Sequence, residues 1–263
     1  MPTTGHLFDH LSKKIIHGLS EHHYFCIVIN YACENRKSIK KIKDLIDRHP
    51  AILVIQGISK FPFYLLDNYP GKVIFFNCFE AEKKLVRARY ILSDYFEGGR
   101  FVAEHFLSLG HKKIIIYTYP IFPDQKSQIN LIEGVKKTFR EKNLSEKNLM
   151  IITDEDRILK ALETEEKPMA VFCDGDFRAK LIYETAEKLN LRIPGDISVV
   201  GYNNTPWCEI FQPNLTSVSI REEELADYVI EEITDKNKNK EILIPPKLII
   251  RESTIAVDKL QIY

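Results

Sequence analysis

The chain has 263 residues, of which 44% are hydrophobic and 28% are charged. Because 37 basic residues balance 37 acidic ones, the formal net charge is zero, which argues against a chain that itself grips DNA or an anionic membrane through a basic face. The length suits one large domain or two closely joined lobes, and it is enough to bury a sizeable core.

The cysteines and the first residues indicate a compartment. The five cysteines contain no CxxC pair, and their odd number does not suit a closed set of disulfides, so we expect reduced thiols in a cytoplasmic protein. The opening MPTTGHLFDHLSKK has no apolar signal core, and no apolar run approaches the roughly 20 residues that a membrane span needs. The sequence predicts neither secretion nor a membrane partner.

Short runs rich in β-branched and aromatic residues alternate with amphipathic stretches along the chain. The runs are almost continuously apolar, as expected for parallel strands that are buried on both faces. Strands and helices in alternation predict βαβ units with right-handed crossovers, and therefore an α/β fold. The expected strands are 24–30, 51–56, 72–77, 112–118, 149–153, 169–173, 196–202, 241–244 and 247–253, and the main helices are 38–48, 98–110, 128–142, 176–190 and 221–235.

The pattern divides near residue 93, with about four strands before it and about four between it and Leu215. This division predicts two doubly wound lobes. Ligands of open α/β sheets lie outside the carboxyl ends of the strands. We therefore expect a ligand in a cleft between the two lobes.

Motifs for catalysis and for metal binding are missing. The sequence contains no P-loop, no GxGxxG after a strand, no GxSxG and no HExxH. Asp94 before Gly98-Gly99 is expected to cap a helix, and 153–157 is expected to begin one. His6 and His10 have a spacing that suits two metal ligands, but no cysteine or carboxylate is matched to them, which favours solvated helix histidines. We expect no catalytic residue, no metal, no cofactor and no enzyme activity.

Two carboxylates, Asp174 and Asp176, follow the strand 169–173. Such a pair could bind a metal or act as acid and base. However, Asp176 lies where the next helix needs an N-cap, and an aspartate there accepts hydrogen bonds from free backbone N–H groups. Capping is the favoured interpretation, with ligand contact possible alongside it.

The end of the chain resembles the effector-binding core of lactose-repressor (LacI/GalR) family transcription regulators. The resemblance is most specific in LNLRIPGDISVVGYNN, PNLTSVSI and PPKLIIREST, which match the family pattern of an isoleucine-proline turn, a strand ending in GyDn, an LT pair and a final R-St. It extends upstream to SDYFEGGRFVAEHFLSLGHKKI, MAVFCDGDFRA and LFDHLSKKIIHGLSEHHYFCIVIN. It therefore covers almost the whole chain.

The resemblance implies a periplasmic-binding-protein-like fold of two flavodoxin-like lobes, each a doubly wound parallel sheet, joined by three crossovers near Ser93, Ile220 and Pro246. The N-terminal lobe is expected to comprise 1–92 plus 221–245, and the C-terminal lobe 93–220 plus 246–263. It also implies a homodimer that binds a small, sugar-like or other metabolite as effector. Binding biases DNA affinity by favouring one of two states.

The chain departs from this family at its start. The N-terminal helix-turn-helix that contacts operator DNA is absent, as is the family's first strand, which is central in a flavodoxin-like sheet. We expect that this is a truncated chain, or an unusual start, of a longer regulator. The regulator would then bind DNA only through that missing domain.

The resemblance implies five effector-contact positions, at which this chain carries fewer charges than the family. Asn203 replaces the aspartate of GyDn, Leu131 replaces an arginine three residues before Gly134, and Asn77 replaces a polar position that is often aspartate. Losing both charges is more coherent than leaving one buried alone. We expect a more neutral site that binds common sugars and sugar phosphates weakly. The complete expected set is Phe8, Asn77, Leu131, Asp176 and Asn203.

Three other readings remain open. A sugar-type solute-binding protein of a transporter could share the fold, although it would need an export signal or a lipid anchor. An enzyme on a doubly wound fold would need a catalytic set that the sequence does not show. A degenerate core could have lost its effector and serve only to dimerise.

Overall fold

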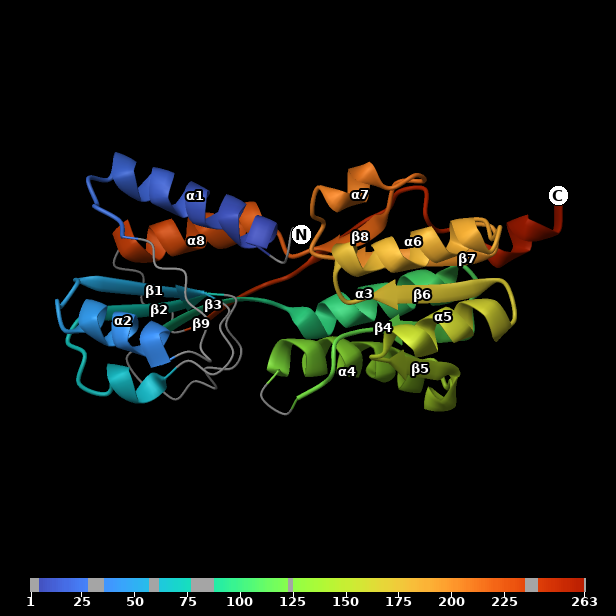
Figure 1. Cartoon of the computed structure of the whole chain (residues 1–263), viewed down its shortest axis with the longest axis horizontal. Helices are drawn as coiled ribbons and strands as arrows, with labels where there is room; N and C mark the ends of the chain where they lie inside the picture. Colours follow the sequence, from blue (N-terminus) through green and yellow to red (C-terminus); the bar gives the residue numbers. More distant parts are fainter. Residues whose placement is uncertain are drawn as a thin grey trace. The chain divides into compact units, whose positions relative to one another are not determined.

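The computed structural model describes residues 5–27, 36–56, 62–76, 88–122, 125–234 and 241–262 (Figure 1). The chain divides into two compact units. Unit 1 comprises Met1–Ser93, Asp124–Lys126 and Arg221–Ile244. Unit 2 comprises Asp94–Pro123, Ser127–Ile220 and Pro245–Tyr263. Each unit has its own sheet with helices against it, which confirms the predicted α/β class.

Unit 1 contains a parallel sheet in the order β1-β2-β3-β9. Its strands are β1 (Ile52–Gln56), β2 (Lys72–Phe76), β3 (Arg89–Ser93) and β9 (Glu241–Ile244). The middle strand β2 is buried along most of its length, so the pattern of continuous apolar residues is that of a strand covered on both faces. Because β9 pairs with β3, the segment 241–244 joins the sheet built by the first part of the chain.

Helices cover both faces of the unit 1 sheet (Figure 1). On one face, α1 (Gly5–Glu21) packs along α8 (Glu222–Thr234), and Gly18 of α1 leaves the space that Ile230 of α8 fills. On the other face lie α2 (Arg36–Ile46) and the short 3-10 helix η1 (Phe63–Leu66). Apolar residues from α2, η1 and the strands form one core cluster: Ile42, Ile46, Leu53, Ile55, Leu66, Tyr69, Val73, Phe75, Ala88, Tyr90 and Leu92.

Unit 2 contains a sheet in the order β10-β8-β7-β6-β4-β5, in which the edge strand β10 runs antiparallel to β8 and the other pairs are parallel. In the chain, β4 is followed by β5 on one side, whereas β6, β7 and β8 then extend from its other side. The direction of strand addition thus reverses between β4 and β6. The strands are β4 (Ile114–Tyr117), β5 (Leu149–Ile152), β6 (Met169–Cys173), β7 (Ile197–Tyr202), β8 (Thr216–Ser219) and β10 (Lys247–Ile249).

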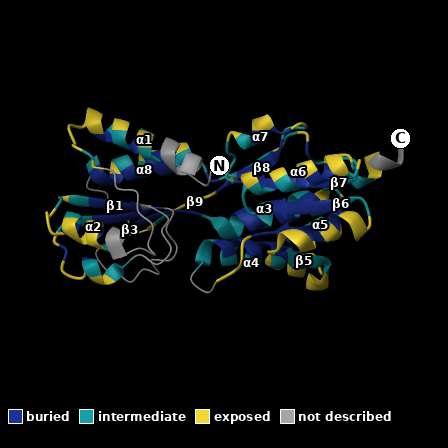
Figure 2. Cartoon of the chain, in the orientation of Figure 1, coloured by how far each residue is buried: buried dark blue, intermediate teal, exposed yellow. Residues whose placement is uncertain are grey.

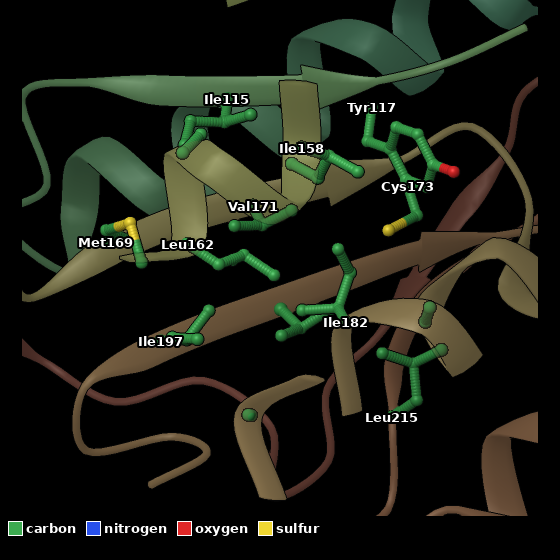
Figure 3. Packing of buried hydrophobic residues seen from close by; sticks show 14 of the residues in the cluster. Ile115, Tyr117, Ile158, Leu162, Met169, Val171, Cys173, Ile182, Ile197 and Leu215 are labelled. Carbon is green, nitrogen blue, oxygen red and sulfur yellow. The ribbon is translucent and has the colours of Figure 1, made fainter. Parts of the chain in front are cut away.

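Helices α5 (Glu155–Thr164) and α6 (Ala179–Lys188) cover one face of this sheet and share a core cluster with β4, β6 and β7 (Figure 3). In Figure 2, β6 is buried throughout, while α5 and α6 turn exposed residues outward. The short helix α7 (Trp207–Ile210) contributes Cys208 to the same cluster. The amphipathic pattern of these segments therefore places their apolar faces on the sheet, as period 3.6 requires.

Helix α3 (Tyr95–Ser108) packs on the opposite face of the sheet, where its Tyr95 ring stacks on the Tyr202 ring of β7. Helix α4 (Lys126–Glu141) crosses α3 at two glycines. A Cβ at Gly99 of α3 would overlap the carbonyl of Leu131, and a Cβ at Gly134 of α4 would overlap the carbonyl of Phe96. The two backbones are thus in direct contact, which only glycine at both positions allows. This close crossing fixes where α4 lies over the sheet.

Most predicted elements are confirmed within one to four residues at their ends. The helix starts are also confirmed, because Asp94 accepts a hydrogen bond from Glu97 N and Asp154 accepts one from Arg157 N. The apolar pattern does not predict β3 or β8. Of the expected strand 24–30, residues 24–27 form neither helix nor strand, and 28–30 lie outside the described residues.

Candidate functional site

The reversal between β4 and β6 in unit 2 marks a position at which side chains from two strands can meet. In open α/β sheets, ligands bind outside the carboxyl ends of the strands at such a switch point. Tyr117, the last residue of β4, pairs with Cys173, the last residue of β6 (Figure 3). The next residues, Thr118 and Asp174, therefore lie side by side at the sheet edge, and the Thr118 hydroxyl donates a hydrogen bond to Asp174 Oδ2. We call this place the switch-point site.

The Asp174 carboxylate is the centre of the switch-point site. Its Oδ2 also accepts hydrogen bonds from Tyr119 N and from Gln128 Nε2 of α4, both at 3.3 Å. The side chain is only 8% exposed, and this burial raises the pKa of Asp174 although the Thr118 bond and the charge of Arg178 oppose the shift. A buried carboxylate with three donors on one oxygen is held in a fixed orientation.

Arg178 supplies the positive charge of the switch-point site. Its guanidinium carbon lies 3.9 Å from the ring centre of Tyr117 and 4.1 Å from that of Tyr119. Its Nη2 donates to Thr118 O at 3.0 Å, and its Nε lies 3.5 Å from Asp174 Oδ1. The side chain is 11% exposed. Two ring faces and a carboxylate thus hold one planar cation.

Gln128 connects α4 to the switch-point site. Its Nε2 donates to Thr118 Oγ1 and, at 2.8 Å, to Tyr119 O, while its buried Oε1 has no hydrogen-bond partner in the structure. A buried acceptor without a partner costs free energy unless another group satisfies it. The switch-point site therefore has two buried acceptors without a hydrogen bond: Gln128 Oε1 and Asp174 Oδ1, of which only the second has an ion-pair contact, with Arg178.

Asp176 has a structural role that differs from the predicted helix cap. The cap prediction is wrong, because Gly175 takes the N-cap position of the short 3-10 helix η3 (Asp176–Arg178) and no side chain caps it. Asp176 is only 1% exposed and turns to the neighbouring strands. Its Oδ2 accepts hydrogen bonds from Thr205 N at 2.6 Å and Thr205 Oγ1 at 2.8 Å, and its Oδ1 accepts one from Ser217 Oγ at 2.6 Å. Burial raises its pKa to about 6.

The two asparagines after β7 form a turn that these contacts hold in place. Asn203 and Asn204 have φ of +93° and +51°, a region that asparagine tolerates better than most residues. Asn204 N donates to Ser217 Oγ at 3.0 Å, and Asn204 Oδ1 accepts from Arg251 Nη2 at 2.8 Å. Asn203 N donates to Val218 O at 2.8 Å and its side chain is half-buried. Of the two, Asn204 is the asparagine whose side chain is fixed by a charged partner.

The structure describes the side chains of three of the five expected effector contacts. Leu131 is buried in α4, one helical turn after Gln128. Asp176 and Asn203 lie at the ends of the neighbouring strands β6 and β7. Phe8 lies in α1 but its side chain is not among the described parts, and Asn77 lies outside the described residues. Their roles as effector contacts remain predictions.

Sequence reasoning missed three polar members of the switch-point site: Thr118, Gln128 and Arg178. Arg178 follows Asp174 by four residues, a spacing that pairs opposite charges on a helical turn and could have indicated it. Gln128 precedes Leu131 by three residues and so lies on the same side of the helix. The expectation of a more neutral site concerns other positions and stays a prediction, while the switch-point site itself contains the ion pair of Asp174 and Arg178, whose formal charges cancel.

The glycine pair at the start of the predicted helix 98–110 has a structural explanation. Gly98 and Gly99 lie inside α3, where Gly98 faces the Tyr202 ring, so both glycines serve packing. Within the described ranges, no three His, Cys, Asp or Glu side chains come together in a way that could hold a metal ion. Among the helices of these same ranges, none is both long enough and apolar enough to cross a membrane.

An open, mainly parallel sheet with fixed polar side chains at its switch point is typical of α/β domains that bind small molecules. The chain belongs to the periplasmic binding protein-like domain family, whose model matches residues 103–254. The match includes every residue of the switch-point site and the asparagine turn.

Relatives in sequence are transcriptional repressors. The chain is 29% identical over 227 residues to the HTH-type transcriptional repressor PurR of Vibrio atlanticus, covering 82% of this chain and 61% of that protein. It is 29% identical over 175 residues to the PurR repressor of Proteus mirabilis, covering 62% of this chain and 51% of that protein. The chain thus matches between half and three-fifths of the length of these relatives.

Solved structures of similar fold are LacI family regulators. One from Enterococcus faecium, with bound ribose, has a TM-score of 0.81 at 23% identity and covers 98% of this chain and 97% of its own. Another from Weissella paramesenteroides, with bound sucrose, has a TM-score of 0.83 at 18% identity, covering 98% and 96%. Together with the repressor relatives, these structures confirm the resemblance to the effector-binding core of lactose-repressor family regulators and the periplasmic-binding-protein-like fold.

Proposed function

We propose that the chain is the effector-sensing and dimerisation core of a LacI-type transcription regulator that acts in the cytoplasm. The observation that carries the proposal is the switch-point site of unit 2, within the region matched by the family model. The relatives named above are repressors, which favours this reading over a transporter's solute-binding protein or an enzyme. The proposed role is binding and not catalysis.

Within unit 2, the proposed effector contacts combine buried polar groups with exposed aromatic rings. Asp174 Oδ1 and Gln128 Oε1 offer acceptors, and the guanidinium of Arg178 offers donors beyond its bond to Thr118 O. Phe177, which is 40% exposed, and the part of Tyr119 that Arg178 does not cover are aromatic surfaces against which an effector can pack; Tyr119 is 45% exposed. Asn203 adds a neutral amide, and Asp176 acts by holding the turn that presents it.

Effector binding in this proposal shifts an equilibrium between two states of the regulator. A ligand shifts such an equilibrium only as far as its affinity differs between the states. We propose two lobes, 1–92 plus 221–245 and 93–220 plus 246–263, and units 1 and 2 support this division because their main bounds lie within one residue of it. Operator DNA would be contacted by a helix-turn-helix segment outside the residues of this chain, since the repressor relatives are of the HTH type.

A thermal-shift screen tests the sensing proposal. The whole chain is heated with a panel of metabolites that includes neutral sugars, sugar phosphates, nucleobases, nucleosides, amino acids and carboxylic acids. A true effector at about ten times its Kd should raise Tm by about 3 °C, because it binds only the folded state. A panel in which nothing gives a saturable shift would argue for a core that only dimerises.

Sedimentation equilibrium tests the dimerisation proposal separately. The chain has a mass of 30.6 kDa, so a homodimer should weigh about twice that value at micromolar concentration. A mass that stays at the monomer value up to about 100 µM would contradict the dimerisation half of the proposal. The sensing half would still rest on the ligand screen.

A further inference from the structure

Neutral sugars are the first effector class to consider, since structures of the same fold contain ribose, sucrose or glucose. A protein typically binds a neutral sugar ring by packing an aromatic face against its C–H groups and by accepting hydrogen bonds from its hydroxyls. The switch-point site contains the groups that could do both.

Arg178 occupies the groups that a sugar would need. Its guanidinium covers one face of Tyr117 and one face of Tyr119, with 3.9 Å and 4.1 Å between the guanidinium carbon and the ring centres. The same side chain lies 3.5 Å from Asp174 Oδ1, the carboxylate oxygen that no hydrogen-bond donor of the chain uses. Arg178 therefore fills the place in which a sugar ring would stack and bond.

We propose that Arg178 is a specificity-determining residue that excludes neutral sugars from the switch-point site. The inference rests on the proposed sensing function and deepens it. A neutral sugar that entered would have to displace a cation from two ring faces, from a carboxylate and from the Thr118 carbonyl, to which Arg178 donates at 3.0 Å. The hydroxyls of a sugar bring no charge that could replace the guanidinium beside a buried carboxylate.

The geometry explains why the exclusion would be selective. Arg178 is 11% exposed, its Nη2 donates to Thr118 O, and its Nε has no hydrogen-bond partner in the structure. The protein therefore does not use all the donors of the guanidinium, which can still donate to a ligand that approaches its edge. An effector with a carboxylate or another planar acceptor could bond to that edge without displacing the cation from the rings. The site thus favours ligands with a charged acceptor over ligands that offer only hydroxyls, because a carboxylate accepts from a guanidinium more strongly than a neutral hydroxyl does.

The experiment compares sugar binding by the whole chain and by its variants. Arg178→Ala frees the ring faces, and Arg178→Ala with Asp174→Asn does so without leaving a buried unpaired carboxylate, should the single variant fold poorly. Arg157→Ala, at an exposed arginine of α5, is the matched control. The probes are D-ribose and D-glucose, added from 0.1 to about 50 mM in thermal-shift and calorimetric titrations.

We expect no saturable response to either sugar in the wild type and in Arg157→Ala. We expect a saturable response in Arg178→Ala or in the double variant, with Tm rising by about 3 °C at about ten times Kd. The proposal is overturned if the wild type binds either sugar as tightly as the variants do, or if the folded variants gain no binding.

The outcome is separable from the sensing proposal. A wild type that responds to another metabolite in the panel supports sensing whatever Arg178→Ala does. If the wild type responds to no metabolite but Arg178→Ala binds ribose, the result would support exclusion by Arg178. The same result would contradict the proposal that the wild-type chain senses an effector.

Discussion

The buried carboxylate of Asp176 fills the space beside Gly201 that a side chain on β7 would need. A Cβ at Gly201 would overlap Asp176 Oδ1 and would also press against the Leu215 side chain. The glycine of the GYNN motif thus admits the carboxylate that bonds to Thr205 and Ser217 and fixes the turn beyond β7. The absence of a side chain at Gly201 is therefore what allows Asp176 to hold this turn.

Gly201→Ala should destabilise the fold by about 1 to 3 kcal/mol, the usual cost of an extra methyl group in a packed core. Gly175→Ala is the matched control. Gly175 has an extended backbone and no atom within 4 Å of an added Cβ, so its change in stability should stay within about 0.5 kcal/mol. Urea denaturation measures both, and equal effects at the two positions would contradict this account of Gly201.

The raised pKa of Asp176 predicts a pH dependence of stability. Burial raises the pKa from 3.8 to about 6 in the folded chain, so the folded state binds a proton more tightly than the unfolded one. The stabilising effect of that proton is complete below pH 3.8 and is lost as pH rises through about 6. A shift of about two pKa units corresponds to about 3 kcal/mol.

Asp176→Asn should remove this contribution, because an amide does not titrate. Urea denaturation at intervals from pH 4 to pH 7 should show a smaller loss of stability with rising pH in the variant than in the wild type. The exposed Asp156 gives the control Asp156→Asn, whose profile should follow the wild type. Parallel profiles for wild type and Asp176→Asn would disprove the assignment.

His111 should contribute a pH dependence of the opposite sign. It is 4% exposed, its Nε2 lies 3.1 Å from Ser198 Oγ, and burial lowers its pKa. The unfolded chain therefore takes up a proton first as pH falls below about 6.5, which destabilises the fold. The variant His111→Asn should lose less stability between pH 7 and pH 5.5 than the wild type does. The exposed control His17→Asn should lose as much as the wild type, and a loss in His111→Asn equal to that of the control would refute this.

In unit 1, the buried Glu232 of α8 joins two strands through their first residues. Its Oε1 lies 2.7 Å from Lys72 Nζ and 3.3 Å from Arg89 Nε, while Glu232 is 1% exposed. Glu232→Gln should cost about 1 to 2 kcal/mol of unfolding free energy, a value reduced because both cations are about 30% exposed. The exposed neighbour Glu231→Gln should change stability by under about 0.5 kcal/mol, and an equal loss there would show that the ion pairs stabilise little.

The sequence predicts most of unit 2 because its strands are apolar almost throughout. Strand β8 is the exception, since Thr216 and Ser217 are buried and polar. Their hydroxyls bond to Asp176 and to the Arg251 backbone, and these partners lie 35 or more residues away in the chain. A pattern that reads only local hydrophobicity does not detect a strand whose polar groups are satisfied by distant residues.

Contacts between distant residues also explain why the sequence predicts only part of the switch-point site. Asp174 and Asp176 follow one strand and look equivalent, but only the fold shows that Asp176 faces β8 while Asp174 faces Thr118. In the sequence, Arg178 is only an arginine four residues after Asp174. Its position between the rings of Tyr117 and Tyr119 depends on the register of β4 against β6.

The most direct test of the account is a calorimetric titration with whichever metabolite stabilises the chain in the thermal-shift screen. The wild type is compared with Asp174→Asn at the switch-point site and with Asp156→Asn on the exposed side of α5. If the effector binds at the carboxyl ends of β4 and β6, Asp174→Asn should raise Kd by about tenfold or more, and Asp156→Asn should leave it unchanged. An Asp174→Asn variant that folds and binds with the wild-type Kd would contradict an effector site at the switch point.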